Sequence, residues 1–422
     1  MTKTLRIACA VAVAAMALTM TTGCKKDQFD PETYHQVVKG VFPIDTIDPQ
    51  HDWQLLGKTT IGITPNVSGV ERVQILTGNP YSTAGVEIIE ERFATEGQHV
   101  YILLKAPVTM TRLWAAAVTG DGQYHVVPFS ITDSEITIGS NATSSGTLHR
   151  PTYIAYTYLY EANFPAPGDF DFNDLVMRIR KWASSPSEIK IEVTLAAAGT
   201  QKQVAAALHI QSLNYDMVKS VTIDEGDRFD QGYPFQRMLI ESDKTMMKGR
   251  NGDVVINLFE DAHWALKNQL LTEGTVYHVP YNTNHNPVEF QSDTVPTKTR
   301  TFTLQLADGY DATNYSLADL DPFAVEQYNS KQFEVHTYYY KFTETLWQYY
   351  GGRQEDYNDL MAWALMVPSS TFRYPLEEIP LCTYRNNELF GAYNRLGHSF
   401  GEWGHDHTTA TDWWLYPVGQ VY

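Results

Sequence analysis

Cysteine is scarce in this chain: of 422 residues only three are cysteines, Cys9, Cys24 and Cys382. Cys9 lies in an N-terminal apolar stretch that we expect to be removed, and Cys24 is predicted below to carry lipid. This excludes a small fold held together by several disulfides, so the chain needs a hydrophobic core. Its hydrophobic content of 43% can supply such a core, in about two domains.

Long apolar runs are also missing. Residues 7–20 form an uncharged, mostly apolar run that is too short for a comfortable membrane span of about 20 residues. Lys3 and Arg6 precede it and small residues follow, which is typical of a secretory signal over residues 1–23. Gly23-Cys24 resembles the cleavage site of bacterial lipoproteins and predicts lipidation of Cys24. A plain signal peptide with an incidental cysteine is the alternative.

Basic residues are in deficit, with 31 Lys and Arg against 49 Asp and Glu, a net charge of −18. This balance argues against nucleic acid as a partner and against electrostatic docking on anionic lipid. It favours a soluble body that attracts cations. The predicted contact with a membrane is therefore the lipid on Cys24.

Helical periodicity is rare, and short strand-like runs separated by turn formers dominate. Prolines and weak periodicity over residues 24–52 predict a flexible tether. We expect an all-β fold of two β-rich, sandwich-like domains, over residues 53–138 and 150–422. The small, polar stretch at 139–147 marks the boundary. The strands predicted for the first domain are Thr59–Thr64, Val70–Leu76, Val86–Glu91, His99–Ala106, Thr111–Val118 and Tyr124–Ile131.

Several catalytic signatures are missing as well: there is no G-x-S-x-G, P-loop, dinucleotide fingerprint or H-E-x-x-H. Glu377 and Glu378 are adjacent, and on an extended chain their side chains point apart, which does not suit a glycosidase pair. A dense group contains His398 and the sequence His405-Asp406-His407. Its spacing matches no strong zinc pattern, so exposed loop histidines are the better interpretation. We predict that the protein is not an enzyme.

What the chain does contain is a crowded acidic stretch, "GDFDFNDLVMRIR", at 168–180. In the strand that follows, Leu175 and alternate residues after it form an apolar face. An unbroken strand running back would place Asp169, Asp171 and Asn173 on that same face, where burial is costly. We therefore expect a bend near Asn173 and Asp174, with the acidic residues in a loop.

Like charges packed so closely need a counterpart. Two carboxylates 4 Å apart repel by ~1 kcal/mol in water and by ~4 kcal/mol at a dielectric constant near 20. Asp169, Asp171, Asn173 and Asp174 offer oxygen ligands at the spacing that calcium takes, although the sequence is no EF-hand loop. We predict a calcium site there, completed by a distant acid such as Glu161 or by backbone carbonyls. A turn network without an ion and a pair of catalytic carboxylates are the alternatives.

A shorter acidic loop recurs as "EDYNDL" at 355–360. Asp356, Asn358 and Asp359 correspond to Asp171, Asn173 and Asp174. Gln354 stands where Asp169 does, so this second copy has fewer potential ligands. It is a possible second acidic loop or a simple turn.

These motifs resemble those of a known family. "PGDFDFNDLVMRI", "AWALMVPSSTFRYPLEEIPL", "AYNRLGHSFGEW" and "DWWLYP" are similar to segments of the LruC-type domain of Bacteroidetes lipoproteins, and they bracket residues 152–417. The resemblance implies an exported, lipid-anchored, mostly β protein of the outer membrane, exposed at the cell surface, whose biochemical function is undefined. It brings no catalytic residues.

The leading hypothesis is thus a lipid-anchored surface protein with a calcium-binding loop and a task in binding or adhesion. Its partner would be a glycan or a surface protein. A carbohydrate-binding or carbohydrate-active protein is one alternative, and a structural subunit of a surface assembly is another.

Overall fold

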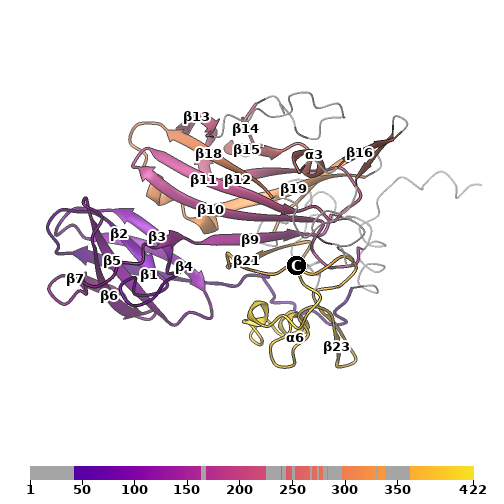
Figure 1. Ribbon diagram of the computed structural model, residues 1–422, viewed down its shortest axis with the longest axis horizontal. Coiled ribbons are helices and arrows are strands. Elements are labelled where there is room, and N and C mark those ends of the chain that lie inside the picture. Colours follow the sequence, from indigo (N-terminus) through magenta and orange to yellow (C-terminus); the bar gives the residue numbers. More distant parts are fainter. Residues whose placement is uncertain are drawn as a thin grey trace, which may run out of the picture.

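The computed structural model describes residues 42–162, 168–224, 239, 244–249, 252–266, 269–272, 275–278, 283, 297–328, 331–337 and 362–422. The predicted signal peptide, Cys24 and the second acidic loop at Asp356, Asn358 and Asp359 lie outside these residues. The described chain is built almost entirely of strands, which confirms the predicted all-β class (Figure 1). None of the described helices has the length and hydrophobicity of a membrane span.

The N-terminal sandwich comprises residues 56–153 and lies at one end of the molecule (Figure 1). One sheet has the order β4-β1-β7 and the other β6-β5-β2-β3-β8. Their bounds are β1 Leu56–Pro65, β2 Val70–Leu76, β3 Glu87–Phe93, β4 Val100–Pro107, β5 Arg112–Thr119, β6 Tyr124–Ser130, β7 Glu135–Ile138 and β8 Thr152–Tyr153.

Alternation of apolar and polar residues explains how these two sheets pack. Ile61 and Ile63 of β1 and Ile102 of β4 face Val73 and Ile75 of β2 in one cluster of buried side chains. Each lies on one face of its strand because successive side chains point to opposite faces. β8 is followed at once by the first strand of the next unit, so the chain passes between the two sandwiches in extended form.

The central sandwich holds the largest hydrophobic core. Its sheets have the orders β13-β18-β11-β10-β9-β21 and β14-β15-β12-β19-β20, and all their neighbours run antiparallel. The strands of the first sheet are β9 Ala155–Tyr160, β10 Leu175–Ser185, β11 Glu188–Ala197, β13 Val218–Ile223, β18 Lys298–Leu306 and β21 Ala364–Val367. Those of the second are β12 Val204–Asn214, β14 Met246–Lys248, β15 Asp253–Phe259, β19 Leu320–Tyr328 and β20 Lys331–Val335.

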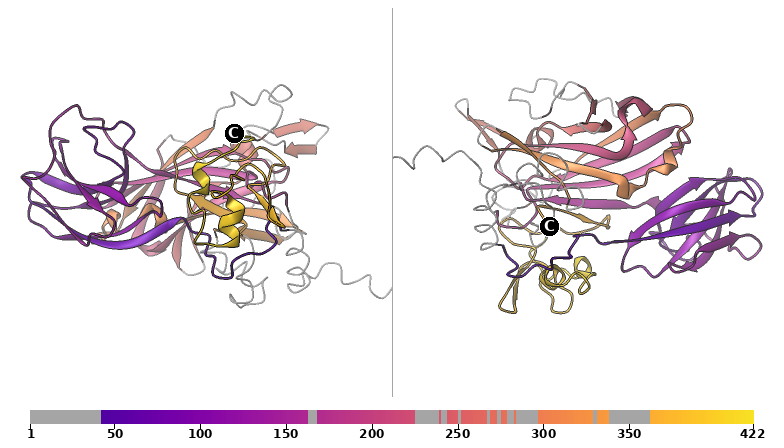
Figure 2. Two further views of the ribbon diagram at one scale, coloured as in Figure 1. Left: turned by 90° about the horizontal axis from the view of Figure 1, so that it is seen from below. Right: turned by 180° about the vertical axis from the view of Figure 1, so that it is seen from behind.

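Smaller elements complete the chain. α3 (Ala262–Ala265) follows β15, β16 (Gln269–Thr272) and β17 (Thr275–His278) pair with each other, and η4 (Leu317–Asp319) precedes β19. Residues 368–422 form a C-terminal lobe with β22 (Thr383–Arg385), β23 (Glu388–Phe390), α6 (Phe400–His405) and η7 (Trp413–Leu415). Figure 2 shows this lobe against the central sandwich.

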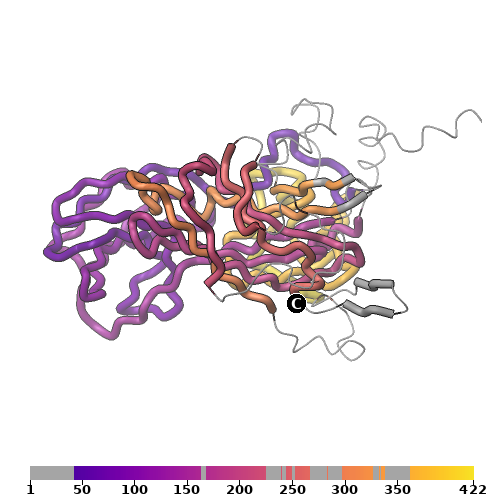
Figure 3. The backbone as a smooth tube through the Cα atoms, turned by 90° about the horizontal axis from the view of Figure 1, so that it is seen from above, coloured from indigo at the N-terminus to yellow at the C-terminus, as the bar shows by residue number. Residues whose placement is uncertain are grey.

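The end of the expected tether is not free. Residues 42–55 lie alongside the C-terminal lobe, as Figure 3 shows from above, with a parallel bridge between Ile44 and Tyr384. The side chains of Phe42, Ile44 and Trp53 are at most 3% exposed and belong to the central core. Prolines had suggested a flexible segment over 24–52, but buried apolar side chains (Phe42, Ile44 and Ile47) hold its described part, residues 42–52, against the rest of the fold.

Candidate calcium site

Four segments of the chain meet at one end of the central sandwich. β9 ends there at Tyr160, β10 begins there at Leu175, and β11 ends there at Ala197. In an antiparallel sheet, one strand ends at the same end of the sheet where its neighbour begins, so the residues just beyond these strand ends come together. A fourth segment, residues 375–378 of the C-terminal lobe, closes over them through hydrogen bonds to Asp171 and Asn173.

The acidic loop does bend, although one to four residues earlier than the sequence suggested. Phe170 and Phe172 have positive φ angles of 59° and 58°, a conformation that bulky residues rarely adopt. The left-handed backbone turns both rings into the core, where they are 4% and 0% exposed. Such strain persists where surrounding structure enforces it, and it is commonest at functional sites.

The expectation that the polar residues avoid the interior was wrong for two of them. Asp171 is 1% and Asn173 0% exposed. They are buried because they bond each other: the Asn173 backbone N–H donates to Asp171 Oδ1 at 3.0 Å, and Asn173 Nδ2 donates to Asp171 Oδ2 at 2.9 Å. The turn network that the sequence left open as an alternative is therefore present, but it does not satisfy every group.

Three carboxylates converge within it. Oxygens of Glu161, Asp169 and Asp171 all lie within 4.8 Å of one another. Two oxygens on opposite sides of a calcium ion, each about 2.4 Å from it, are separated by about the same distance. Glu161 was proposed as the distant ligand from sequence, and the structure brings it to the loop. Asp169 is exposed, whereas Glu161 is 1% exposed.

Asn173 supplies an oxygen that has no partner. Its Nδ2 faces two acceptors, Asp171 Oδ2 and the carbonyl of Pro375, which fixes the orientation of the amide. Its Oδ1 is buried and accepts no hydrogen bond. An unsatisfied buried carbonyl costs about 1–3 kcal/mol unless a donor or a cation meets it.

Glu377 is the site residue that sequence reasoning missed. Asn173 Oδ1 and Glu377 Oε2 lie 2.1 Å and 3.0 Å from the point where a Cβ on Gly199 would sit. Thr283 Oγ1 donates to Glu377 Oε2 at 2.9 Å. The adjacent Glu378 donates its backbone N–H to Asp171 Oδ2 at 2.9 Å. No local pattern shows that residues about 200 positions away reach this loop.

Two glycines make room for these oxygens. At Gly168 a Cβ would lie 1.5 Å from Glu161 Oε1, and at Gly199 it would overlap Asn173 Oδ1. A side chain at either position would displace the acidic groups. The glycines therefore allow the backbone to approach the site closely.

The electrostatics show how poorly the acids tolerate one another. Burial, and then the charges of neighbouring carboxylates, raise the pKa values of Glu161 and Asp171 well above their ordinary range. Asp169 is exposed as a whole, but its carboxyl group loses part of its hydration, and this raises its pKa; burial raises the pKa of Asp174 and of Glu377 to about 7. The Ala162 backbone N–H and Lys202 act in the opposite direction on Asp174 without outweighing burial. Ionised together at neutral pH, these groups need a cation.

The arrangement suits metal binding better than catalysis. Glycoside hydrolysis needs two carboxyl groups on either side of an open substrate cleft. Here Glu161 and Asp171 are almost wholly buried and Asp171 is held by an amide and two backbone N–H groups. The donor set of carboxylates and an amide carbonyl fits a hard cation such as calcium.

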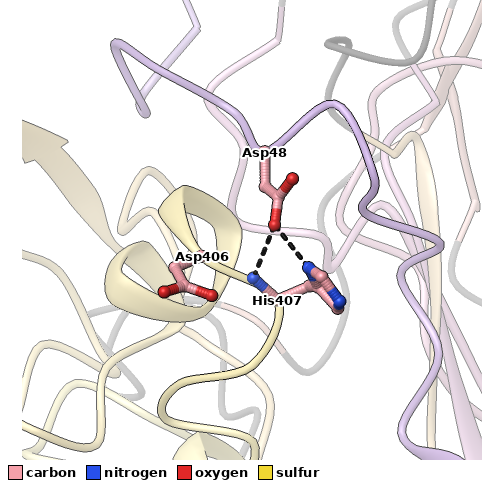
Figure 4. Close-up of side chains that lie close together, drawn as sticks. All are labelled: Asp48, Asp406 and His407. Atoms are coloured by element: carbon pink, nitrogen blue, oxygen red, sulfur yellow. Dashed lines mark hydrogen bonds and ion pairs between the residues drawn. The ribbon is translucent and has the colours of Figure 1, made fainter.

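The histidine group does not form a common site. His398 Nδ1 contacts both carboxylate oxygens of Asp412 at 2.9 Å, and His405 Nδ1 lies 3.2 Å from the Thr46 carbonyl. His407 instead bonds Asp48, as Figure 4 shows, with Asp406 beside them. Each imidazole has its own partner. The interpretation as exposed loop histidines was only partly right, because His398 and His407 are half-buried and the exposed His405 is the last residue of α6.

Asp48 acts as an attachment point for the N-terminal segment. The His407 backbone N–H donates to Asp48 Oδ2 at 3.1 Å, and the Gln50 N–H donates to its Oδ1 at 2.8 Å. Burial opposes ionisation, but these hydrogen bonds prevail and lower the pKa of Asp48 to about 2. Asp406 Oδ1 already accepts two hydrogen bonds from Thr408. All three side chains are thus accounted for without an ion.

Comparison with known proteins places the chain in a family. Residues 187–414, more than half of the sequence, match the family described as "Domain of unknown function (DUF4842)". The chain belongs to this family. The DUF4842 region begins at β11 and includes Gly199 and Glu377, whereas the acidic loop at 168–174 precedes it. The resemblance to the LruC-type domain stays a prediction, because the matched family bears a different description.

Other comparisons add little. A search of the curated proteins found no match. A crystal structure at 2.08 Å of a Bacteroides ovatus protein, provisionally described as a lipoprotein, is similar to the DUF4842 chain with a TM-score of 0.49. The two are 11% identical, and the alignment covers 84% of this chain and 99% of the other. At that level of similarity no functional argument follows.

Proposed function

We propose that this protein is a lipid-anchored binding or adhesion protein of the outer membrane, and not an enzyme, whose central sandwich is held together by calcium. The observation that carries the calcium assignment is the buried, unpartnered Asn173 Oδ1 beside converging carboxylates. Glu161, Asp169 and Asp171 would form one side of the coordination sphere, and Asn173 and Glu377 the other. Asp174, whose Oδ2 accepts the Ala162 backbone N–H at 2.6 Å, would lie at its edge.

Calcium would join segments that are far apart in the sequence. Glu161 follows β9, the acidic loop precedes β10, and Glu377 belongs to the C-terminal lobe. A single ion that binds all three would fix the lobe on the sandwich, and with it residues 42–55, which lie on that lobe. A rigid β body on a lipid anchor is suited to contact with a glycan or a surface protein.

Titration calorimetry on the purified chain tests the ion. Wild type should bind calcium at one site and prefer it to magnesium, because the ligands are many and irregularly placed. Asp171→Asn should lose this binding. Asp308→Asn removes an equally charged carboxylate that is exposed and paired with Lys219, and it should bind as wild type does. Equal heats from wild type and Asp171→Asn would refute the assignment.

Cell fractionation tests the anchor and the location. Labelled palmitate should be incorporated into wild type and not into Cys24→Ser, and the variant should move from the membrane fraction to the soluble fraction. A protease added to intact cells should cleave the wild-type protein if it is surface exposed. Membrane association of the unlabelled variant would contradict the lipid anchor.

A structural role in a surface assembly is the second candidate, and the edge strand β4 favours it. Within the described part of the chain β4 pairs only with β1. Two of its outward side chains, Tyr101 and Leu103, are 62% and 50% exposed. Exposed apolar residues on a free edge are suited to pairing with an added strand. Tyr101→Lys should abolish any self-association seen by sedimentation; monomeric wild type would dismiss this candidate.

A further inference from the structure

Two neighbouring segments of the C-terminal lobe carry almost no charge. Residues 389–397, "LFGAYNRLG", and 413–418, "WWLYPV", contain no acidic side chain and a single basic one, Arg395, in a chain whose net charge is −18. The segments lie side by side, because the Val418 backbone N–H donates to the Ala392 carbonyl at 2.9 Å. In so acidic a protein, a surface without carboxylates needs a physical reason.

Apolar side chains of these segments are exposed to solvent. Leu396 is 80% exposed, and Leu415 and Val418 are each 49% exposed. Leu396 stands at the tip of a turn that is closed by a hydrogen bond of 2.9 Å from the His398 N–H to the carbonyl three residues earlier. Gly397 supplies the positive φ of 81° that this turn needs. Turn tips favour Gly, Pro, Asn, Asp and Ser, so a leucine there points to contact with an apolar phase.

Basic and aromatic groups stand beside these apolar residues. The Arg395 guanidinium lies 4.7 Å from the centre of the Tyr416 ring. Arg373 is exposed, and its Nη2 donates to the Val421 carbonyl at 3.3 Å. Arginine and tyrosine combine an apolar stem or ring with a polar end, so both are suited to the boundary between lipid headgroups and acyl chains.

The nearest carboxylates are occupied by donors of the lobe itself. Glu402 Oε2 accepts the Gly397 N–H at 2.8 Å and the Ser399 hydroxyl at 2.7 Å. Asp412 contacts His398 Nδ1 at 2.9 Å. Each negative charge next to the two segments is thus engaged in hydrogen bonds, which reduces its repulsion of lipid phosphates.

The position of this lobe along the chain favours a membrane as its partner. The N-terminal segment enters the described fold on the same lobe, where the Asp45 N–H donates to the Tyr384 carbonyl at 3.1 Å and the Asn386 N–H to Asp45 Oδ2 at 3.0 Å. Residues 25–41 connect it to Cys24, and a chain of that length spans at most about 60 Å. A lipid on Cys24 would keep the lobe within that distance of a membrane, where a weak affinity suffices for contact.

We propose that the C-terminal lobe lies on the membrane that holds the lipid anchor, with Leu396, Leu415 and Val418 inserted between headgroups and acyl chains. Arg395 would contact lipid phosphates, and Tyr416 would lie at the headgroup level. Apolar burial drives this contact, so it does not conflict with the acidic charge of the whole chain. The inference rests on the proposed lipid on Cys24, and it adds which face of the protein meets the membrane.

Flotation with phosphatidylcholine vesicles tests the surface without the anchor. The probe is the chain 25–422, which keeps every described residue and lacks both the apolar N-terminal segment and Cys24. It should bind at lipid concentrations on the order of 1 mM, with little dependence on salt. Leu396→Ser should weaken binding about tenfold, because one leucine is no longer buried. Leu103→Ser is the matched control, since Leu103 is 50% exposed on β4 of the N-terminal sandwich, and it should bind as wild type does.

Amide hydrogen exchange gives a second measurement on the lipidated protein. Exchange over residues 395–397 and 415–418 should be slower in wild type anchored to vesicles than in the chain 25–422 in solution. Because Leu396 stands at an exposed turn tip, its variant should keep the wild-type melting temperature. Equal exchange in the two states, or equal flotation of wild type and Leu396→Ser, would overturn the proposal.

The remaining outcomes identify what failed. Self-association of the chain 25–422 that Leu396→Ser abolishes, seen by sedimentation without vesicles, would assign the surface to a second copy and overturn its contact with lipid. Palmitate labelling of Cys24 without flotation of the chain 25–422 would overturn this inference alone. Flotation without palmitate labelling would support the membrane-binding surface and overturn only the proposed anchor.

Discussion

Removing calcium should make the protein sensitive to alkaline rather than acidic conditions. Without an ion, the folded state keeps protons on its crowded acids, because their pKa values are raised. Asp174 and Glu377 titrate at about 7 in the folded chain, against ordinary values of 3.8 and 4.5. Between those limits the folded state holds more protons than the unfolded one. Its stability must therefore fall as the pH rises from about 4 to about 7.

The size of this loss follows from the same groups. Each carboxyl contributes a slope of at most about 1.4 kcal/mol per pH unit within its window. Both side chains keep some solvent contact, and discounting for this leaves a combined loss on the order of 3 kcal/mol between pH 5 and pH 7. Most proteins with paired carboxylates behave in the opposite way over that range.

Calcium should cancel the loss. It would bind the ionised carboxylates, so its effect should grow as the pH rises. At a concentration about a hundredfold above Kd it would add about 2.7 kcal/mol. For a unit of some 200 residues this corresponds to a rise in Tm of about 5–10 °C. The rise should be largest near pH 8 and small near pH 5.

Differential scanning calorimetry at about pH 5.5 and about pH 8, in calcium and in EDTA, measures both the loss of stability with rising pH and the rise in Tm with calcium. Asp171→Ala should lose the calcium-dependent rise, and Asp308→Ala, an exposed carboxylate on the central sandwich, should keep it. If the wild-type unfolding curves in calcium and in EDTA were superimposable at pH 8, the proposed calcium site would be refuted. A Tm in EDTA that increases between pH 5.5 and pH 8 would refute the reasoning from raised pKa values.

Three further predictions concern other parts of the fold. Gly199→Ala should weaken calcium binding and cost about 1–3 kcal/mol, since its Cβ would overlap Asn173 Oδ1, whereas Gly57→Ala, with 3.8 Å to the nearest atom, should be nearly neutral by calorimetry. His336, whose Nδ1 lies 2.8 Å from a buried oxygen of Asp321, has its pKa raised to about 10. Its stabilisation should be present below pH 6.5 and disappear as the pH rises through about 10, and His336→Leu should cost about 3–5 kcal/mol in urea unfolding. Asp48→Asn should speed hydrogen exchange over residues 43–53, and the wild-type contribution of Asp48 should be lost as the pH falls from about 4 to about 2, its folded pKa.

Much of the fold could be predicted from the alternation of apolar and polar residues along single strands. The run Val70–Leu76 is β2 to the residue, and Tyr124–Ile131 differs from β6 by one position. Each such strand buries one face, and the apolar residues at every second position of the local sequence indicate that face directly.

The site could be predicted only in part, because its ligands come from distant segments. Crowded charge revealed the loop and suggested Glu161 as a partner. Nothing in the local sequence indicated that Glu377 would reach Gly199, or that Phe170 would adopt a left-handed backbone. Likewise, prolines before β1 suggested a tether, and the pairing of Ile44 with Tyr384 depends on a contact 340 residues away.

The docking of residues 42–48 determines how the molecule bears mechanical load. A force applied to the chain at residue 42 acts first on the C-terminal lobe. It is transmitted by two hydrogen bonds, from the Asp45 N–H to the Tyr384 carbonyl and from the Asp48 N–H to the Gly404 carbonyl. Force from a membrane anchor would thus enter near the chain's own C-terminus and travel through the central sandwich. The N-terminal sandwich, although next along the backbone, would lie outside that path, joined to the central sandwich through contacts such as Arg72 with the Ala183 carbonyl.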